Sequence, residues 1–225
     1  MNFVNALLVL LVRIAGSFLV RLDSRQLARL PKRGPCILAM NHVNFLDGPL
    51  LLSRLFPRRV ASLAKKETWK NPIVGFLASA IGAIPLDRGF SDPAALRKAA
   101  AVLDGGGFLY INPEGTRSRD GVLRKGKAGV VSIALATGSP VVPVAFEGLE
   151  DFSSNFRRLR RTKAIIHVGE PFVLLPPPEG SQREARAEAL EEIMQKIAAL
   201  LPEAKRGEFG SRKPELAKHT RTVSF

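Results

Sequence analysis

The chain has 225 residues, 46% of them hydrophobic, which is enough for one large folded domain with a substantial core. Its 34 Lys and Arg outnumber 20 Asp and Glu, and the net charge of +14 predicts an anionic partner such as nucleic acid, a membrane surface or a phosphorylated substrate. The single cysteine, Cys36, excludes an intramolecular disulfide, and no Cys/His cluster has the spacing of metal ligands, so we expect no metal site.

The most apolar stretch opens the chain, and we expect residues 1–30 to anchor it to a membrane. A signal peptide carries basic residues before its apolar run, whereas here they come within or after it, although "AGS" resembles a cleavage site. A spanning helix would bury Arg13 at a cost of about 2.5–3.5 kcal/mol. A helix lying in the interface fits better. The reason is a narrow polar stripe at helical spacing: Asn2, Asn5, Arg13, Ser17 and Arg21. A helix of the globular core is the remaining alternative.

Predicted strands and helices alternate through residues 31–202. Short apolar runs bounded by turn residues predict strands at 36–40, 60–64, 83–86, 108–111, 141–146 and 164–169. Helical patterns with Pro near their start or Gly near their end predict helices at about 49–55, 71–82, 127–137 and 181–201, and one within 91–107 that starts at Pro93 and ends near the glycines. This alternation is typical of an α/β domain with a mixed, largely parallel central sheet flanked by helices. The polar, basic tail at 203–225 is expected to be disordered.

The first polar stretch after a predicted strand is "NHVNFLD", which holds His42 and Asp47. Five residues separate them, so they would share neither a helix face nor a strand face. The chain must turn between the two if they touch. Gly48-Pro49 follows at once, and Pro is favoured in the first turn of a helix. We therefore expect a strand–turn–helix junction that brings the carboxylate back to the imidazole.

Three further stretches follow other predicted strands or lie within them. "GAIPLDRG" carries Asp87 and Arg88, "NPEGTRS" carries residues 114–117, and "VVPV" carries Pro143. Loops that follow parallel strands meet at one edge of a sheet, where ligands bind. The four stretches are therefore expected to form one site.

In this order and spacing, the four stretches resemble the motifs of the glycerolipid acyltransferase family typified by 1-acyl-sn-glycerol-3-phosphate acyltransferases. The resemblance covers roughly residues 35–144 and, more loosely, 169–172. Three positions depart from the family pattern: Asn44 where Ser is common, Asn112 where Phe is common, and Pro85 where an aromatic is common. These departures bear on substrate identity more than on the type of reaction.

The resemblance implies transfer of a fatty acyl group from acyl-CoA or acyl-carrier protein to the sn-2 hydroxyl of 1-acylglycerol 3-phosphate, giving phosphatidic acid. His42 would be the general base, because imidazole titrates near neutrality, and Asp47 would fix its tautomer. The acceptor hydroxyl would attack the thioester directly. No cofactor is expected, since the thioester is already activated. Cys36 lies too far along an extended strand to serve as the nucleophile and is expected to be buried packing.

Substrate contacts are expected from the two loops that carry the other motifs. Arg88 and Arg117 would hold the acceptor phosphate, because a guanidinium can bind two oxygens at once, and Thr116 would add a hydroxyl donor. Glu114 is expected to orient Arg88 or the backbone, since a carboxylate repels phosphate. Gly115 would allow a tight turn.

Two alternatives stay open. The same chemistry could act on another acceptor, such as a lyso-ornithine lipid or glycerol 3-phosphate. The chain could instead be a non-enzymatic basic protein that binds membrane or nucleic acid, although it has no helix-turn-helix, zinc-finger or aromatic RNA-binding motif, so no nucleic-acid partner is expected. The leading hypothesis places the protein on the cytoplasmic face of the cell membrane, as a monotopic or peripheral enzyme with its basic residues near anionic lipids.

Overall fold

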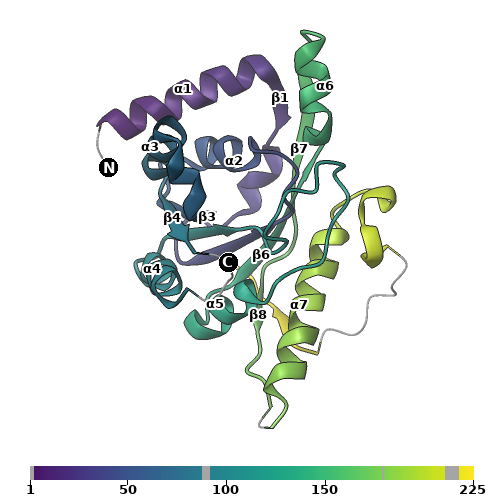
Figure 1. Cartoon of the computed structure of the whole chain (residues 1–225). Helices are drawn as coiled ribbons and strands as arrows, with labels where there is room; N and C mark the ends of the chain where they lie inside the picture. Colours follow the sequence, from purple (N-terminus) through teal and green to yellow (C-terminus); the bar gives the residue numbers. More distant parts are fainter. Residues whose placement is uncertain (1–2, 88–91, 179, 211–217) are drawn as a thin grey trace.

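The computed structural model describes residues 3–87, 92–178, 180–210 and 218–225 and forms three layers (Figure 1). The middle layer is a sheet whose strands run in the order β1-β7-β6-β2-β5-β3-β4, with β8 paired to β6 and β9 paired to β8. Five of the pairings are parallel, and those of β6 with β7, β6 with β8 and β8 with β9 are antiparallel. The predicted mixed, largely parallel α/β fold is confirmed.

The strands among the described residues are β1 (Val20–Asp23), β2 (Cys36–Met40), β3 (Val60–Lys65), β4 (Ala83–Leu86), β5 (Phe108–Ile111), β6 (Val141–Glu147), β7 (Thr162–Val168), β8 (Phe172–Leu174) and β9 (Thr220–Thr222). The helices are α1 (Phe3–Leu19), α2 (Asp47–Leu55), α3 (Pro72–Ala80), α4 (Pro93–Asp104), α5 (Gly129–Thr137), α6 (Phe152–Arg157) and α7 (Gln182–Ala198). Short 3₁₀ turns join them: η1 (Arg25–Arg29), η2 (Lys66–Lys70), η3 (Leu149–Asp151), η4 (Glu203–Lys205) and η5 (Gly207–Phe209).

Each face of the sheet has its own apolar core. On one face, residues of α4, α5 and α7 pack against the strands; on the other, α2 and η1 do so. All five residues of β2 are buried because helices cover both faces, which explains why "CILAM" shows no alternation. In α4, Asp92 caps the helix by accepting hydrogen bonds from the N–H groups of Ala94 and Ala95, and Pro93 occupies its first position. The predicted start of this helix at Pro93 is therefore confirmed, and the Asp92 cap explains it.

Helix α1 packs on α2 and leaves much of its apolar surface outside. The two helices approach closely at Gly16, where a Cβ atom would lie 2.7 Å from a methyl carbon of Leu50. Its large exposed apolar side chains are Leu7, Leu10, Leu11, Ile14 and Phe18, and Arg13 and Ala15 are exposed as well. Among the described residues, no helix combines the length and the apolar character that crossing a bilayer would need.

Both ends of the chain are more integrated into the domain than the sequence predicts. The 1–30 segment includes β1, which pairs with β7, and η1, whose Leu27 lies in the core, so the peripheral part ends at Leu19. The predicted disorder of 203–225 does not hold for the described tail residues. Phe209 is buried, and β9 is fixed because the Glu192 carboxylate accepts hydrogen bonds from the N–H groups of Lys218 and His219 and from the Thr220 hydroxyl.

Strand β7 alternates cleanly, with Ile166 in the core and Ile165 partly exposed on the opposite side. Ile166→Ala should lower the free energy of unfolding by about 2–5 kcal/mol, because it leaves a cavity. The matched control, Ile165→Ala, should cost much less. Chemical denaturation of both variants checks this. Equal losses, or a larger loss for Ile165→Ala, would mean that β7 pairs one residue out of the described register.

Candidate active site

His42 and Asp47 meet where β2 ends and α2 begins. His42 Nδ1 lies 2.9 Å from Asp47 Oδ2, and α2 begins at Asp47 itself, two residues before the predicted start. The chain reverses between them, as the spacing required. Asp47 is fully buried, whereas about a quarter of the His42 side-chain surface is accessible. One imidazole nitrogen therefore faces the carboxylate, while the ring remains open to a small reactant.

The Asp47 carboxylate also holds the turn itself. Its oxygens accept hydrogen bonds from the backbone N–H of Val43, at 2.7 Å, and from that of Asn44, at 3.0 and 3.1 Å. Hydrogen bonds from N–H groups to a carboxylate are stronger than those to a neutral acceptor. The same group that orients the imidazole therefore fixes the backbone that carries it.

Glu114 supports His42 from the neighbouring strand. It follows β5 and is only 2% exposed, with one oxygen accepting the His42 backbone N–H at 2.7 Å and the other accepting the Arg124 backbone N–H at 3.0 Å. Burial raises its pKa to about 7, and the two N–H donors oppose that shift. Of the two expected roles, orienting Arg88 or the backbone, these hydrogen bonds favour the second.

The residues that follow Glu114 in the "PEGTR" turn are more exposed. Gly115 has φ +65°, a left-handed conformation that favours glycine, and its N–H closes the turn on the Asn112 carbonyl. Thr116 and Arg117 are exposed beside it. Arg88, the other expected phosphate ligand, lies outside the described residues. Asp87, next to it, pairs with Lys66 after β3 at 3.1 Å, so the loops that follow β3 and β4 lie together.

Lys127 was not predicted as a site residue. A Cβ atom on Gly115 would lie 3.1 Å from the Lys127 Nζ atom, and the Lys127 backbone N–H donates to the Pro113 carbonyl. This ammonium group therefore lies directly over the turn. The sequence shows only one basic residue among several in "LRKGK", and no spacing rule singles it out.

Three asparagines, of which two were expected to bear on substrate identity, hold the loops in place through hydrogen bonds to backbone. The Asn41 side-chain amide donates to the Phe146 carbonyl at 2.9 Å and accepts the Phe146 N–H at 2.8 Å, so it ties the end of β2 to β6. Asn44 donates to the Leu149 carbonyl, and its oxygen accepts the Leu46 N–H. Asn112 donates to the carbonyls of Met40 and Asn41. Two of the departures from the family pattern thus bind backbone.

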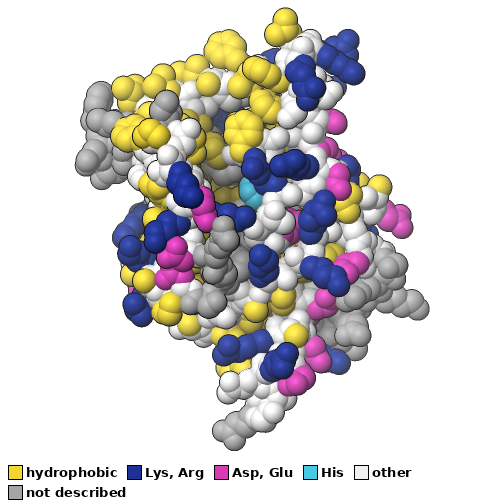
Figure 2. All heavy atoms as spheres, viewed as in Figure 1, with side chains coloured by type: hydrophobic (Ala, Val, Ile, Leu, Met, Phe, Trp, Pro, Cys, Tyr) yellow, Lys and Arg dark blue, Asp and Glu magenta, His cyan; other side chains and the backbone are white. Residues whose placement is uncertain are grey.

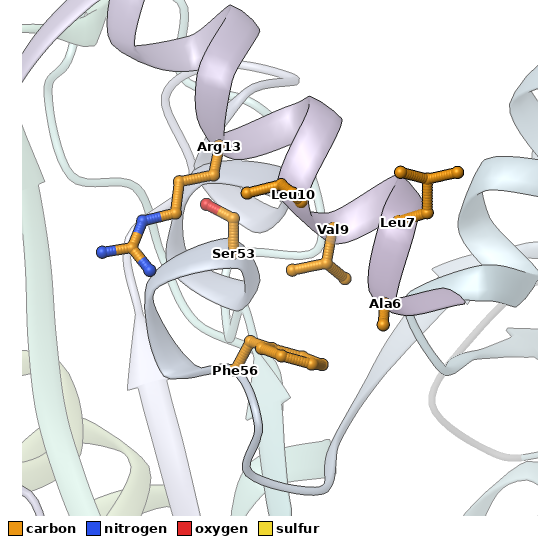
Figure 3. Close-up of a pocket in the computed structure, with 7 residues that line it drawn as sticks. All are labelled: Ala6, Leu7, Val9, Leu10, Arg13, Ser53 and Phe56. Carbon is orange, nitrogen blue, oxygen red and sulfur yellow. The ribbon is translucent and has the colours of Figure 1, made fainter. Parts of the chain in front are cut away.

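Other candidate groups lie elsewhere. Cys36 is buried, as expected, and burial raises the pKa of its thiol to about 12, so it carries no nucleophilic thiolate near neutral pH. His167 pairs with Glu147. A cavity of about 460 Å³ lies between α1 and the end of α2, lined by apolar side chains of α1 together with Arg13, Ser53 and Phe56 (Figure 3). Its lining includes neither His42 nor Asp47.

The raised pKa of Glu114 predicts a pH-dependent stability. In the unfolded chain this carboxyl would lose its proton near pH 4.5, and in the folded chain near pH 7. The folded state therefore binds the proton more tightly, and stability from this group falls as the pH rises from about 4.5 to about 7, by at most about 1.4 kcal/mol per pH unit. Glu114→Gln cannot ionise. Its stability relative to the parent should rise over that range in thermal unfolding, whereas a constant difference would contradict the assignment.

Comparison with known proteins adds the family. A sequence model of the acyltransferase family matches residues 21–147. A 1-acyl-sn-glycerol-3-phosphate acyltransferase from Bacillus subtilis is 29% identical, over 87% of this chain and 97% of that protein. A lyso-ornithine lipid O-acyltransferase from Pseudomonas aeruginosa is 31% identical, over 75% of this chain and 69% of that protein.

Two further matches differ in extent. A chloroplastic 1-acyl-sn-glycerol-3-phosphate acyltransferase from Brassica napus is 35% identical over 56% of this chain, but the match spans only 37% of that longer protein. The crystal structure of the 1-acyl-sn-glycerophosphate acyltransferase from Thermotoga maritima superposes with a TM-score of 0.62 at 26% identity, covering 88% of this chain and 78% of that one. The matched family region contains β2, α2 and the "PEGTR" turn, so the chain belongs to the acyltransferase family of enzymes.

Proposed function

We propose that this chain transfers a fatty acyl group from the thioester of CoA or acyl-carrier protein to the sn-2 hydroxyl of 1-acylglycerol 3-phosphate, giving phosphatidic acid. The observation that carries the proposal is a partly exposed imidazole held at 2.9 Å by a buried carboxylate. The Bacillus subtilis and Brassica napus relatives, whose names give this acceptor, support it. Membership of an enzyme family also argues against a role limited to binding nucleic acid.

His42 acts as the base through its Nε2 atom. With Nδ1–H donating to Asp47, Nε2 carries a lone pair and takes the proton of the acceptor hydroxyl as its oxygen attacks the thioester carbonyl. Asp47 stabilises the imidazolium that forms. When the tetrahedral intermediate collapses, the carbon–sulfur bond breaks and the imidazolium returns the proton to the departing thiolate. Glu114 keeps His42 at the strand end by holding its backbone N–H.

The acceptor phosphate binds at the exposed turn after β5. Arg117 supplies a fork of donors, Thr116 a hydroxyl, and Lys127 an ammonium group above Gly115. Gly115 permits the tight turn that presents them, and Arg88 is proposed from its motif position alone. These side chains follow the strand next to β2, so a phosphate held there leaves the acceptor's hydroxyl within reach of the His42 loop.

A second acceptor class is favoured by one observation. The Pseudomonas aeruginosa relative that matches three quarters of this chain is named for a lyso-ornithine lipid. The chemistry at His42 would be the same, but the acceptor would carry no phosphate, so the cationic turn would not be needed for binding. The two acceptors are therefore distinguished by how much the reaction depends on that turn.

The protein is proposed to bind the cytoplasmic face of the cell membrane through α1, the helical part of the expected 1–30 anchor. Apolar side chains gather over α1 and α3 at the top of the molecule, with Lys and Arg side chains beside and below them (Figure 2). Ser17 of α1 instead faces inward, towards Arg54 of α2. A helix that exposes large apolar side chains together with the basic Arg13 suits an interface with anionic lipid.

The proposed chemistry is tested by thiol release from a long-chain acyl-CoA, with and without 1-acylglycerol 3-phosphate, in detergent. His42→Ala and Asp47→Asn should each lower acceptor-dependent release by about 10³–10⁴-fold, because the base or its orientation is lost. His167→Ala is the matched histidine control and should keep most activity. Circular dichroism confirms folding. Full release by folded His42→Ala would overturn the mechanism.

The phosphate site is tested with paired acceptors. Arg117→Ala should raise the KM for 1-acylglycerol 3-phosphate by roughly 10-fold or more, since a charge-assisted contact to an anion contributes about 1.5–3 kcal/mol. The KM for a phosphate-free lysolipid should stay unchanged. Arg97→Ala, which removes a charge from exposed α4, is the control. A KM that does not move for either acceptor would remove Arg117 from the site.

A further inference from the structure

Helix α6 ends in a tip that the proposed chemistry does not use. Residues 156–161 read "FRRLRR", and every one of these side chains is exposed. Phe156 is 54% exposed and Leu159 is 94% exposed. Two exposed apolar side chains thus stand among four exposed arginines at the end of a short helix. Exposing two large apolar side chains to water is unfavourable, so folding alone does not explain this arrangement.

The backbone of the tip is built to hold Leu159 outward. The N–H groups of Arg158 and Arg160 both donate to the Asn155 carbonyl, and that of Leu159 donates to the Phe156 carbonyl. Leu159 adopts φ +53°, a left-handed conformation that favours glycine. The turn is therefore closed and satisfied, and it places a large apolar residue where a small one would fit the backbone better.

The tip is joined to the active-site loop by aromatic contacts. Phe45, between His42 and Asp47, meets Phe152 edge-on with ring centroids 6.0 Å apart, and Phe152 stacks on Phe156 at 5.8 Å. Asn44 adds a hydrogen bond to the Leu149 carbonyl just before α6. Phe45 is itself 57% exposed. An apolar row thus runs from the loop that carries the proposed base to the tip.

The tip is also joined to α1. An Arg161 guanidinium nitrogen donates to the Ser17 carbonyl at 2.5 Å, and β7, which starts after the tip, pairs with β1, which follows α1. In Figure 1, α6 rises beside the end of α1 at the top of the molecule. Two exposed apolar elements, α1 and the tip, therefore lie side by side.

We infer that the tip of α6, residues 156–161, is a second membrane-contact site that binds an anionic phospholipid bilayer, with Phe156 and Leu159 entering the interface and the arginines meeting the lipid phosphates. Positive charge flanking apolar side chains is complementary to an anionic interface. The inference rests on the proposed function for its biological setting. A helix lying on a membrane can still rotate about its axis, and a second contact fixes the orientation in which the His42 loop faces the lipid.

Binding to vesicles tests the tip without any acyl donor. We expect the full chain to sediment with mixed phosphatidylcholine–phosphatidylglycerol vesicles. Phe156→Ser with Leu159→Ser, and separately Arg157→Ala with Arg158→Ala, should each weaken binding roughly 10-fold or more. The controls are Phe225→Ser, an exposed aromatic beyond the opposite end of β7, and Arg97→Ala with Lys98→Ala, the same charge change on α4. Controls that weaken binding as much as the tip variants would overturn the inference.

A fluorescent label locates the contact directly. Leu159→Cys introduces an exposed thiol, whereas the native Cys36 is buried. A polarity-sensitive dye on residue 159 should shift to the blue with the mixed vesicles and much less with pure phosphatidylcholine, while a dye on Phe225→Cys should not. A silent label on vesicle-bound protein would show that α1 binds alone and would overturn the inference. So would a response to duplex DNA but not to vesicles. Acyl transfer in detergent is measured separately, so failure of the proposed function remains distinguishable.

Discussion

The Asp47 carboxylate is the interaction on which the site depends. It is buried at the first residue of α2, and it collects the Nδ1 atom of His42 together with two backbone N–H groups of the connecting turn. A buried carboxylate needs such donors, because an unpaired one would be costly. The buried Asp47 carboxylate requires hydrogen-bond donors, and the chain reversal supplies them. The same reversal places the His42 imidazole beside the carboxylate. Folding and the proposed proton transfer share one group.

Two side-chain amides and one carboxylate hold the backbone just beyond the end of β2. Asn41 continues the pairing of β2 with β6 through its side chain, Asn112 binds the last carbonyls of the same strand, and Glu114 holds the next N–H. Strands normally lose their partners where they end. Here side chains supply the hydrogen-bond partners of Asn41 and His42, the two residues that follow β2. The loop therefore starts from a fixed position, while its outer residues remain accessible to ligands.

Much of this could be predicted from the sequence. Buried strands such as residues 36–40 and 108–111 were placed correctly, because apolar runs between turn residues depend on local chemistry. Strands that depend on partners far along the chain were not predicted. β1 forms by pairing with β7, and β9 forms by pairing with β8 and by hydrogen bonding to Glu192. In the site, the motif spacing predicted the His42–Asp47 contact. Lys127 over Gly115 could not be foreseen, since their contact arises from folding. Asn44 and Asn112 were attributed to substrate choice because only coordinates show their backbone partners.

The central place of β2 has a consequence for motion. It lies between β5 and β6, and all five of its residues are buried beneath helices on both faces. The least stable parts of a protein open locally without unfolding the remainder. Peripheral parts such as α1 and the tail can open in this way while β2 stays closed. Amide protons of this strand would then exchange only on global unfolding, so the imidazole at its end rests on the most persistent part of the molecule.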